Sequence, residues 1–235
     1  MGMKLLDLVF PRRCPVCHDP VDVPGCLICR SCEGKLSFVS GPTCFKCGKE
    51  ITDAGRELCR DCERLARPFS RSFALLNYDD TARSSILRFK NGGRREYADY
   101  YAEKFMELYG EALREAGIEA VVPVPIHADR RYERGYNQAA EFGRGLARAL
   151  QIPMREDLLS RVRMSGQQKS LSAAARARDI ASSLKASDEA ALFRRILLVD
   201  DVYTTGGTLS ACARTLQKAG TREIVCAVIG IGSER

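Results

Sequence analysis

The segment LLVDDVYTTGGT, residues 197–208, combines two carboxylates with a run of threonine and glycine. An apolar strand that leads into such a loop and then into a helix forms a binding site for an anion. Glycine lets the main chain approach closely, and the first amides of a helix point outward without partners. Threonine hydroxyls add neutral donors. We therefore expect residues 204–208 to bind a phosphate.

Asp200 and Asp201 follow the apolar run directly, at the strand end where α/β sheets bind ligands. Carboxylates repel a phosphate, so they are expected to contact ribose hydroxyls or Mg²⁺ on the same ligand. A sugar 5-phosphate meets both demands. The loop lacks the lysine of the GxxxxGK[ST] motif of nucleoside triphosphatases and is not GxGxxG. The plainer interpretation, a polar strand end before a glycine-rich turn, is less favoured.

Cysteines dominate the first quarter of the chain, where nine of the eleven lie between Cys14 and Cys62. Eight of them form two copies of the spacing C-x2-C-x11-C-x2-C, thirty residues apart. A repeat of this regularity indicates duplicated modules. The eight cysteines are Cys14, Cys17, Cys29 and Cys32, then Cys44, Cys47, Cys59 and Cys62.

Each copy is typical of a structural zinc site, because two CxxC knuckles close a tetrahedral thiolate shell. A module of about 30 residues buries too little apolar surface to fold alone, so metal would supply the missing free energy. We expect a tandem zinc ribbon with two structural Zn²⁺ and no catalysis. Cys26 also forms a CxxC with Cys29, but Arg56 stands at its repeat position. A [4Fe–4S] cluster fits less well, and His18 is expected to be a bystander.

Length and composition limit the number of domains and the evidence for nucleic-acid binding. The 235 residues, 45% hydrophobic and 29% charged, allow one full core and a smaller module. Two zinc–thiolate sites would lower the formal net charge of +7 by about four, so overall basicity is weak evidence for nucleic acid. Residues 129–178 hold eleven Lys or Arg against five Asp or Glu. On charge alone, a solvated basic face is favoured over a binding patch.

Location is predicted from what the sequence lacks. The start, MGMKLLDLVFPRRC, has only a short apolar stretch and no small-residue cleavage site, so no secretory signal is expected. No run approaches the roughly 18 apolar residues of a membrane span. We therefore expect a cytoplasmic protein without membrane insertion, in which reduced thiols bind metal rather than form disulfides.

The composition changes after the last clustered cysteine, and Pro68 marks the predicted boundary between residues 1–66, the double zinc ribbon, and residues 67–235. In the second part, apolar strands alternate with amphipathic helices, which predicts a mostly parallel α/β sheet. The expected strands are 72–78, 120–125, 194–199 and 224–231. The expected helices are 81–93, 97–116, 137–150, a stretch near 173–180 and the segment after the loop that carries Leu209, Cys212 and Leu216.

Residues 196–208, ILLVDDVYTTGGT, closely resemble the phosphoribosyl pyrophosphate (PRPP) motif of type I phosphoribosyltransferases. The whole chain resembles the competence protein F (ComF) family, which joins a double zinc ribbon to such a domain. LLDLVFPRRCPVC is similar to the opening of the family, VPVPIHADRRYERGYNQAAEFGRGLA to its central signature and QKSLSAAARARDI to its variable loop. The resemblance implies a phosphoribosyltransferase-like parallel sheet flanked by helices.

The resemblance also implies roles for individual residues. Asp200 and Asp201 would contact the ribose hydroxyls and, with Lys90, would form the catalytic group. PRPP, accompanied by Mg²⁺, would further be bound by Val202, Thr204, Thr205, Gly206, Gly207 and Thr208. Pyrophosphate and a closing loop would involve Arg130, Arg134, Gln168 and Arg176. The family usually has asparagine where this chain has Asp179, which puts loop closure in doubt.

Two functions of different classes follow. The first is an enzyme that transfers phosphoribose from PRPP to an acceptor that the sequence does not identify, in a process linked to DNA uptake. The second is a non-catalytic PRPP sensor, or an accessory that binds single-stranded DNA and a helicase-like competence partner. The link to competence is implied by the resemblance alone. A purely structural scaffold is disfavoured by the intact phosphate loop.

Overall fold

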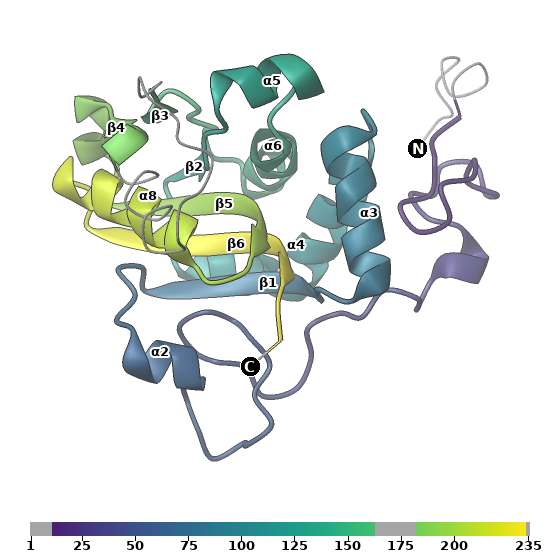
Figure 1. Ribbon diagram of the computed structural model, residues 1–235, viewed down its shortest axis with the longest axis horizontal. Coiled ribbons are helices and arrows are strands. Elements are labelled where there is room, and N and C mark those ends of the chain that lie inside the picture. The colour runs from purple at the N-terminus through teal and green to yellow at the C-terminus, as the bar shows by residue number, and fades with distance from the viewer. Residues whose placement is uncertain (1–10, 163–181, 234–235) are drawn as a thin grey trace, which may run out of the picture.

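The computed structural model describes residues 11–162 and 182–233. Its centre is a parallel four-stranded sheet with strand order β1-β6-β5-β2 (Figure 1). Strands β5 and β6 lie in the middle, and their almost continuous apolar runs fit strands that are covered on both faces. The strands are β1 (Arg71–Asn77), β2 (Ala120–Pro123), β5 (Arg195–Tyr203) and β6 (Glu223–Ile231). The predicted parallel sheet is confirmed.

Helices cover both faces of this sheet. One face packs against α3 (Asp80–Asn91), α4 (Tyr97–Glu115) and α6 (Gln138–Leu150), with Phe89, Phe105 and Phe142 fully buried between the layers. The other face packs against α8 (Gly207–Lys218) through Leu209, Cys212 and Leu216. These four helices lie where the apolar spacing predicts them. Within residues 11–162 and 182–233, no helix is both long enough and apolar enough to cross a bilayer.

Several short elements do not follow from the sequence pattern. Helix α5 (Ala128–Arg134) has no buried residue, so it shows no apolar periodicity that could predict it. The antiparallel hairpin of β3 (Leu159–Arg161) and β4 (Leu184–Ala186) has only three residues in each strand. The remaining short pieces are η1 (Arg30–Cys32), α2 (Arg60–Arg64) and η2 (Asp188–Leu192). The helix expected near 173–180 lies outside the described residues.

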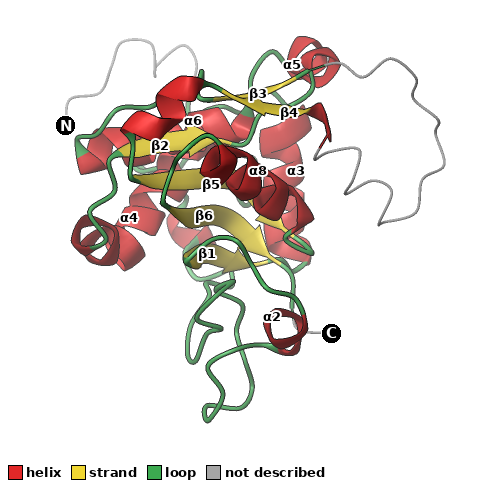
Figure 2. Cartoon of the chain, turned by 90° about the vertical axis from the view of Figure 1, so that its left-hand side faces the viewer, coloured by secondary structure: helices red, strands yellow, loops and turns green. Residues whose placement is uncertain are grey.

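The two cysteine modules pack on opposite faces of the same sheet. Cys14 and Cys32 belong to the buried cluster that contains α3, α4 and α6, whereas Cys44 and Cys59 belong to the cluster that contains α8. The first module lies beside α3, and the second lies below β1 with α2 (Figures 1 and 2). The modules are therefore part of the two cores.

The linker between the modules covers the outer edge of β1. The Val39 amide donates to the Leu75 carbonyl at 3.0 Å, and the Asn77 amide donates to the Ser37 carbonyl at 2.8 Å. An uncovered edge strand would expose a row of unpaired amides and carbonyls to other chains. The linker pairs with this edge and so covers it. The N-terminal region therefore contributes to the edge of the sheet as well as to the two cores.

Candidate functional site

The phosphate turn, residues 204–208, joins the C-terminal end of β5 to the start of α8. Gly206 is the N-cap of α8, and the Ser210 amide donates to its carbonyl at 2.9 Å as the first bond of the helix. The amides of residues 207–209 precede this bond and have no carbonyl of the helix to pair with. Thr204 and Thr205 are exposed beside them. The turn thus presents main-chain donors and hydroxyls at the positive end of a twelve-residue helix.

Both the backbone conformation at position 206 and the close approach of a neighbouring side chain require glycine there. Its φ of +73° lies in the left-handed region, which residues with a Cβ rarely adopt. A methyl group at this position would lie 2.5 Å from Cζ of Tyr203 and closer still to the hydroxyl oxygen. The ring of Tyr203 therefore forms the support on which the turn rests.

The two carboxylates belong to β5, which continues through them to Tyr203 rather than ending at Val199 as the apolar run predicts. Neighbouring side chains of a strand point to opposite faces of a sheet. Asp201 lies 3.0 Å from Lys90 of α3, measured from Oδ1 to Nζ, with 14% and 21% of the two side chains exposed. Asp200 accepts a hydrogen bond from the Asp201 amide at 2.8 Å. The acids thus share one strand end but have different partners.

Asp200 retains its proton more strongly than an ordinary carboxylic acid. Burial and, to a smaller extent, the neighbouring charge of Asp201 raise its pKa to about 8, against the lowering effects of the Asp201 amide and Lys90. The two acids and Lys90 therefore carry little net charge near neutral pH. A neutral Asp200 beside an ion pair can both donate and accept hydrogen bonds, which suits recognition of a diol.

Lys90 is held in place by the start of α6, a feature that sequence reasoning missed. The Gln138 side-chain amide donates to the Lys90 carbonyl at 3.2 Å, and the Tyr136 hydroxyl donates to the Phe89 carbonyl. Asn137 donates to the Val124 carbonyl at 3.0 Å from the same segment. Three buried polar residues in sequence, before an apolar helix, are the signal that could have indicated this role.

The predicted pyrophosphate residues lie on α5, which follows the C-terminal end of β2. The Val124 amide donates to the Val199 carbonyl at 2.8 Å, so this loop leaves the sheet beside the acidic pair. Arg130 is exposed and Arg134 is half-buried. His127 caps α5 by accepting from the Asp129 amide at 3.4 Å. Three further predicted positions, Gln168, Arg176 and Asp179, lie outside the described residues.

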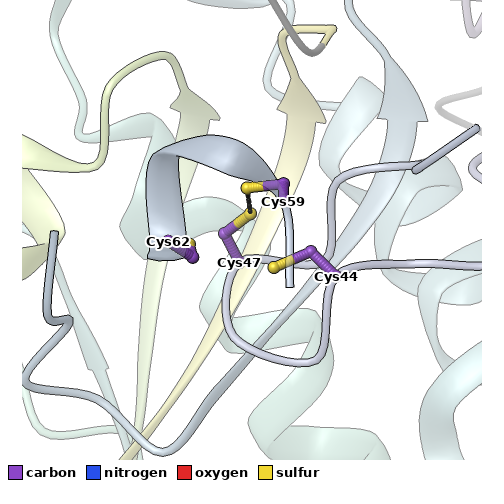
Figure 3. Close-up of side chains that lie close together, drawn as sticks. All are labelled: Cys44, Cys47, Cys59 and Cys62. Atoms are coloured by element: carbon purple, nitrogen blue, oxygen red, sulfur yellow. Dashed lines mark hydrogen bonds between the residues drawn. The ribbon is translucent and has the colours of Figure 1, made fainter. Parts of the chain in front are cut away.

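The second cysteine cluster brings all four predicted ligands together. Cys44, Cys47, Cys59 and Cys62 are buried, and their sulfur atoms lie within 4.8 Å of one another (Figure 3). Hydrogen bonds from the neighbouring thiols lower the pKa of Cys44 and favour its thiolate. Four sulfur donors in a closed, buried shell fit tetrahedral zinc and leave no open position for a substrate.

The first cluster is less complete. Cys14, Cys17 and Cys32 have sulfur atoms within 4.8 Å of one another, while the Cys29 sulfur lies 3.9 Å from that of Cys17. Cys17 is exposed, in contrast to every cysteine of the second cluster. The donor chemistry again fits zinc, and Cys29 is the expected fourth ligand.

The difference between the clusters predicts that zinc leaves them at different rates. A chromogenic chelator should remove about two zinc ions per chain in two phases, the faster one from the first cluster, because Cys17 is open to attack. Cys14→Ser should abolish the fast phase, and Cys44→Ser the slow one. Equal release rates in the wild-type chain would contradict this assignment.

Comparison with known proteins is consistent with this arrangement. A family model described as a double zinc ribbon domain matches residues 5–63, and a phosphoribosyl transferase domain model matches residues 137–231. A solved purine phosphoribosyltransferase from Pyrococcus horikoshii Ot3 covers 59% of the chain and 72% of its own, with 17% identity and a TM-score of 0.34. That likeness is too remote to support any statement about the site.

Curated relatives match the chain over nearly its full length. Competence protein F of Haemophilus influenzae is 30% identical over 92% of this chain and 95% of its own. Competence protein ComFC of Bacillus subtilis is 28% identical over 82% of this chain and 79% of its own. DNA utilization protein YhgH of Escherichia coli K12 is 26% identical over 92% of this chain and 96% of its own. With cysteine modules and a glycine-capped turn where the sequence predicts them, the chain belongs to the competence protein F family.

Proposed function

We propose that the chain binds PRPP with Mg²⁺ and transfers the phosphoribosyl group to an acceptor, in a cytoplasmic process connected with DNA uptake. The observation that carries the proposal is the strand end of β5. There, an acidic pair balanced by Lys90 directly precedes a glycine-capped helix start with free amides. The competence and DNA-utilization names of the relatives support the biological context.

Each part of a phosphoribosyl ligand has a chemically suitable partner. The amides of residues 207–209 and the hydroxyls of Thr204, Thr205 and Thr208 would bind the 5′-phosphate. Asp200 and Asp201 would bind the ribose hydroxyls, with Asp200 able to donate as well as accept. Mg²⁺ would neutralise charge on pyrophosphate, and carboxylate oxygens are ligands that suit it.

In the proposed reaction, the bond from C1′ to pyrophosphate breaks and a bond from C1′ to the acceptor forms. Positive charge develops on the ribose ring, and the ionised Asp201 would stabilise it electrostatically. Lys90, Arg130 and Arg134 would stabilise the departing pyrophosphate, and Gln168 and Arg176 would belong to the segment that closes over it. The acceptor loses its proton to water or to a group of its own.

The proposal is tested by calorimetric titration of PRPP into the wild-type chain with and without Mg²⁺. We expect one PRPP per chain, with affinity at least about tenfold lower without Mg²⁺ and for ribose 5-phosphate, which lacks the pyrophosphate. Release of pyrophosphate in the presence of a panel of bases would identify catalysis. Absence of PRPP binding at millimolar concentration would refute the proposal, and binding without turnover would favour a PRPP sensor.

A second function, binding of single-stranded DNA beside a helicase-like partner, is favoured by the surface of α5. Tyr132 is 93% exposed there, between Arg130 and Arg131 on one side and Arg134 on the other. Exposed aromatics among cations are typical of surfaces on which single-stranded bases stack.

Tyr132→Ala should accordingly weaken binding of an oligo-dT strand by about 1–3 kcal/mol, which is about 5-fold to 150-fold. Fluorescence anisotropy at two salt concentrations measures this loss, because contacts to phosphates add a salt dependence. Phe45→Ala removes an aromatic side chain that is 53% exposed on the second ribbon and serves as the matched control. Equal affinities of the two variants would exclude α5 as the DNA surface.

A further inference from the structure

The second cysteine cluster and the phosphate turn share one buried core. Cys47 and Cys62 pack in the same cluster of buried side chains as Tyr203, the residue before the turn, and Leu209, in the first turn of α8. The cysteines of the first module pack in the core on the opposite face of the sheet. Of the two clusters, the second therefore shares its core with the turn, and the first does not.

Arg67 stands between this cluster and the turn. Its guanidinium lies close enough to the Cys62 thiol to favour the thiolate, and the guanidinium carbon lies 6.0 Å from the centroid of the Tyr203 ring. The main chain beside it is fixed from two directions. Lys46 of the second module donates to the Phe69 carbonyl at 3.1 Å, and Gln217 of α8 donates to the Pro68 carbonyl at 2.7 Å.

Tyr203 continues the connection to the turn itself. The side chain is 2% exposed, and its hydroxyl end contacts Gly206, the N-cap of α8. A shift of this ring would move the residue from which the free amides of the phosphate turn begin. The contacts thus run without a gap from Cys62 through Arg67 and Tyr203 to Gly206.

Two polar atoms along this path lack hydrogen-bond partners among the described residues. Tyr203 Oη and Arg67 Nε are both buried and unpaired. A buried hydroxyl without a partner lowers stability, and phenylalanine at position 203 would avoid this cost. The hydroxyl therefore does not stabilise the fold, and its contact with Gly206 is the effect that remains.

We propose that Arg67 and Tyr203 are positioning residues that connect the second cysteine cluster to the phosphate turn, so that metal in this cluster orders the turn. Four thiolates with Zn²⁺ carry a net charge of about −2, which attracts the Arg67 guanidinium and holds it over the Tyr203 ring. The held ring in turn fixes Gly206. The consequence for PRPP affinity rests on the proposed function, whereas the order of the turn does not.

Tyr203→Phe separates positioning from stability. The variant should unfold at the same or a higher temperature than wild type, while the Ser210 amide, which is bonded to the Gly206 carbonyl, exchanges with deuterium at least about fivefold faster. PRPP affinity should fall by a similar factor. Tyr109→Phe is the matched control, because this hydroxyl donates to the Ala74 carbonyl at 2.8 Å from the other face. It should lower stability without changing exchange in the turn.

The dependence on metal is tested by a double-mutant cycle. Cys44→Ser should accelerate exchange of the Ser210 amide, and Cys17→Ser, in the first cluster, should not. Combined with Tyr203→Phe, Cys44→Ser should add little, because the connection is already broken. Arg67→Met provides a second route if Cys44→Ser fails to fold. It should retain zinc in the second cluster yet accelerate exchange in the turn, and Arg67→Lys should restore part of the protection.

The outcomes distinguish this proposal from the proposed function. Unchanged exchange of the turn in Tyr203→Phe and Arg67→Met would overturn the connection, whether or not PRPP binds. Additive effects of Cys44→Ser and Tyr203→Phe would also overturn it, because independent sites add. Faster exchange in a chain that does not bind PRPP would refute the proposed function and leave the connection standing.

Discussion

Asp201→Asn is expected to weaken PRPP–Mg²⁺ binding at least about a hundredfold, and Asp200→Asn and Asp201→Asn are expected to change stability in opposite directions. Asp201→Asn removes the charged carboxylate at the proposed ribose site, and hydrogen bonds to charged groups are worth about 1.5–3 kcal/mol. Asp200→Asn should weaken binding less, because an amide donates and accepts hydrogen bonds as the neutral acid does. The stability effects differ because the free protein treats the two acids differently. Asp201 is paired with Lys90, whereas Asp200 is half-buried with a raised pKa.

The direction in which Asp200→Asn changes the free energy of unfolding follows from proton linkage. Its pKa is about 8 in the folded chain, against about 4 for an unfolded aspartate. Between these values the unfolded chain has released a proton that the folded chain retains, so stability falls as the pH rises from about 4 to 8. Asparagine does not ionise. Asp200→Asn should therefore flatten this slope and raise the free energy of unfolding at pH 8 by about 1–3 kcal/mol.

Asp201→Asn is expected to lower the free energy of unfolding instead. Removing its charge leaves the Lys90 ammonium without its partner at 3.0 Å in a site where it is only 21% exposed. Loss of one member of a largely buried ion pair should lower stability by about 1–3 kcal/mol. Urea denaturation at pH 5 and pH 8 measures both effects, and calorimetry measures PRPP binding. Wild-type affinity in a folded Asp201→Asn variant would exclude the strand end of β5 as the ribose site.

Much of this site is predictable because its signals are local. The strand, the turn and the helix around residues 195–218 are consecutive, and each has its own pattern of apolar, small and periodic residues. The cysteine spacing predicts the second cluster for the same reason, since the geometry of a CxxC knuckle lies within four residues. Lys90, by contrast, was assigned by resemblance, and its contact with Asp201 depends on how α3 packs on the sheet.

What the sequence did not predict depends on tertiary packing. Nothing in the cysteine repeat indicates that its two copies lie on opposite faces of one sheet, because identical spacing gives identical local folds. The sequence did not predict that Asp200 and Asp201 have different partners, because the apolar run stops at Val199 while the strand continues to Tyr203. Tyr203 shows its role only through contact with Gly206 and Arg67.

Removing zinc from both clusters is expected to destabilise the whole chain, including the sheet. Cys14 and Cys44 are almost completely buried in the two cores, and the linker between the modules is paired with the edge of β1. Structural zinc contributes about 10–16 kcal/mol in isolated zinc-finger peptides, as much as the total stability of a typical domain. Loss of even about 5 kcal/mol should lower the melting temperature by about 10–20 °C.

Circular dichroism before and after chelation measures this change, and hydrogen exchange locates it. The Asn77 amide should lose protection, because its partner is the Ser37 carbonyl of the linker. Added zinc should restore both signals, which controls for irreversible oxidation of the thiols. If residues 67–235 expressed alone melt like the zinc-loaded chain, the predicted boundary after residue 66 marks an autonomous domain. If they melt far lower or aggregate through β1, the ribbons are a structural half of the sheet, and metal supply would then determine whether the phosphate turn exists at all.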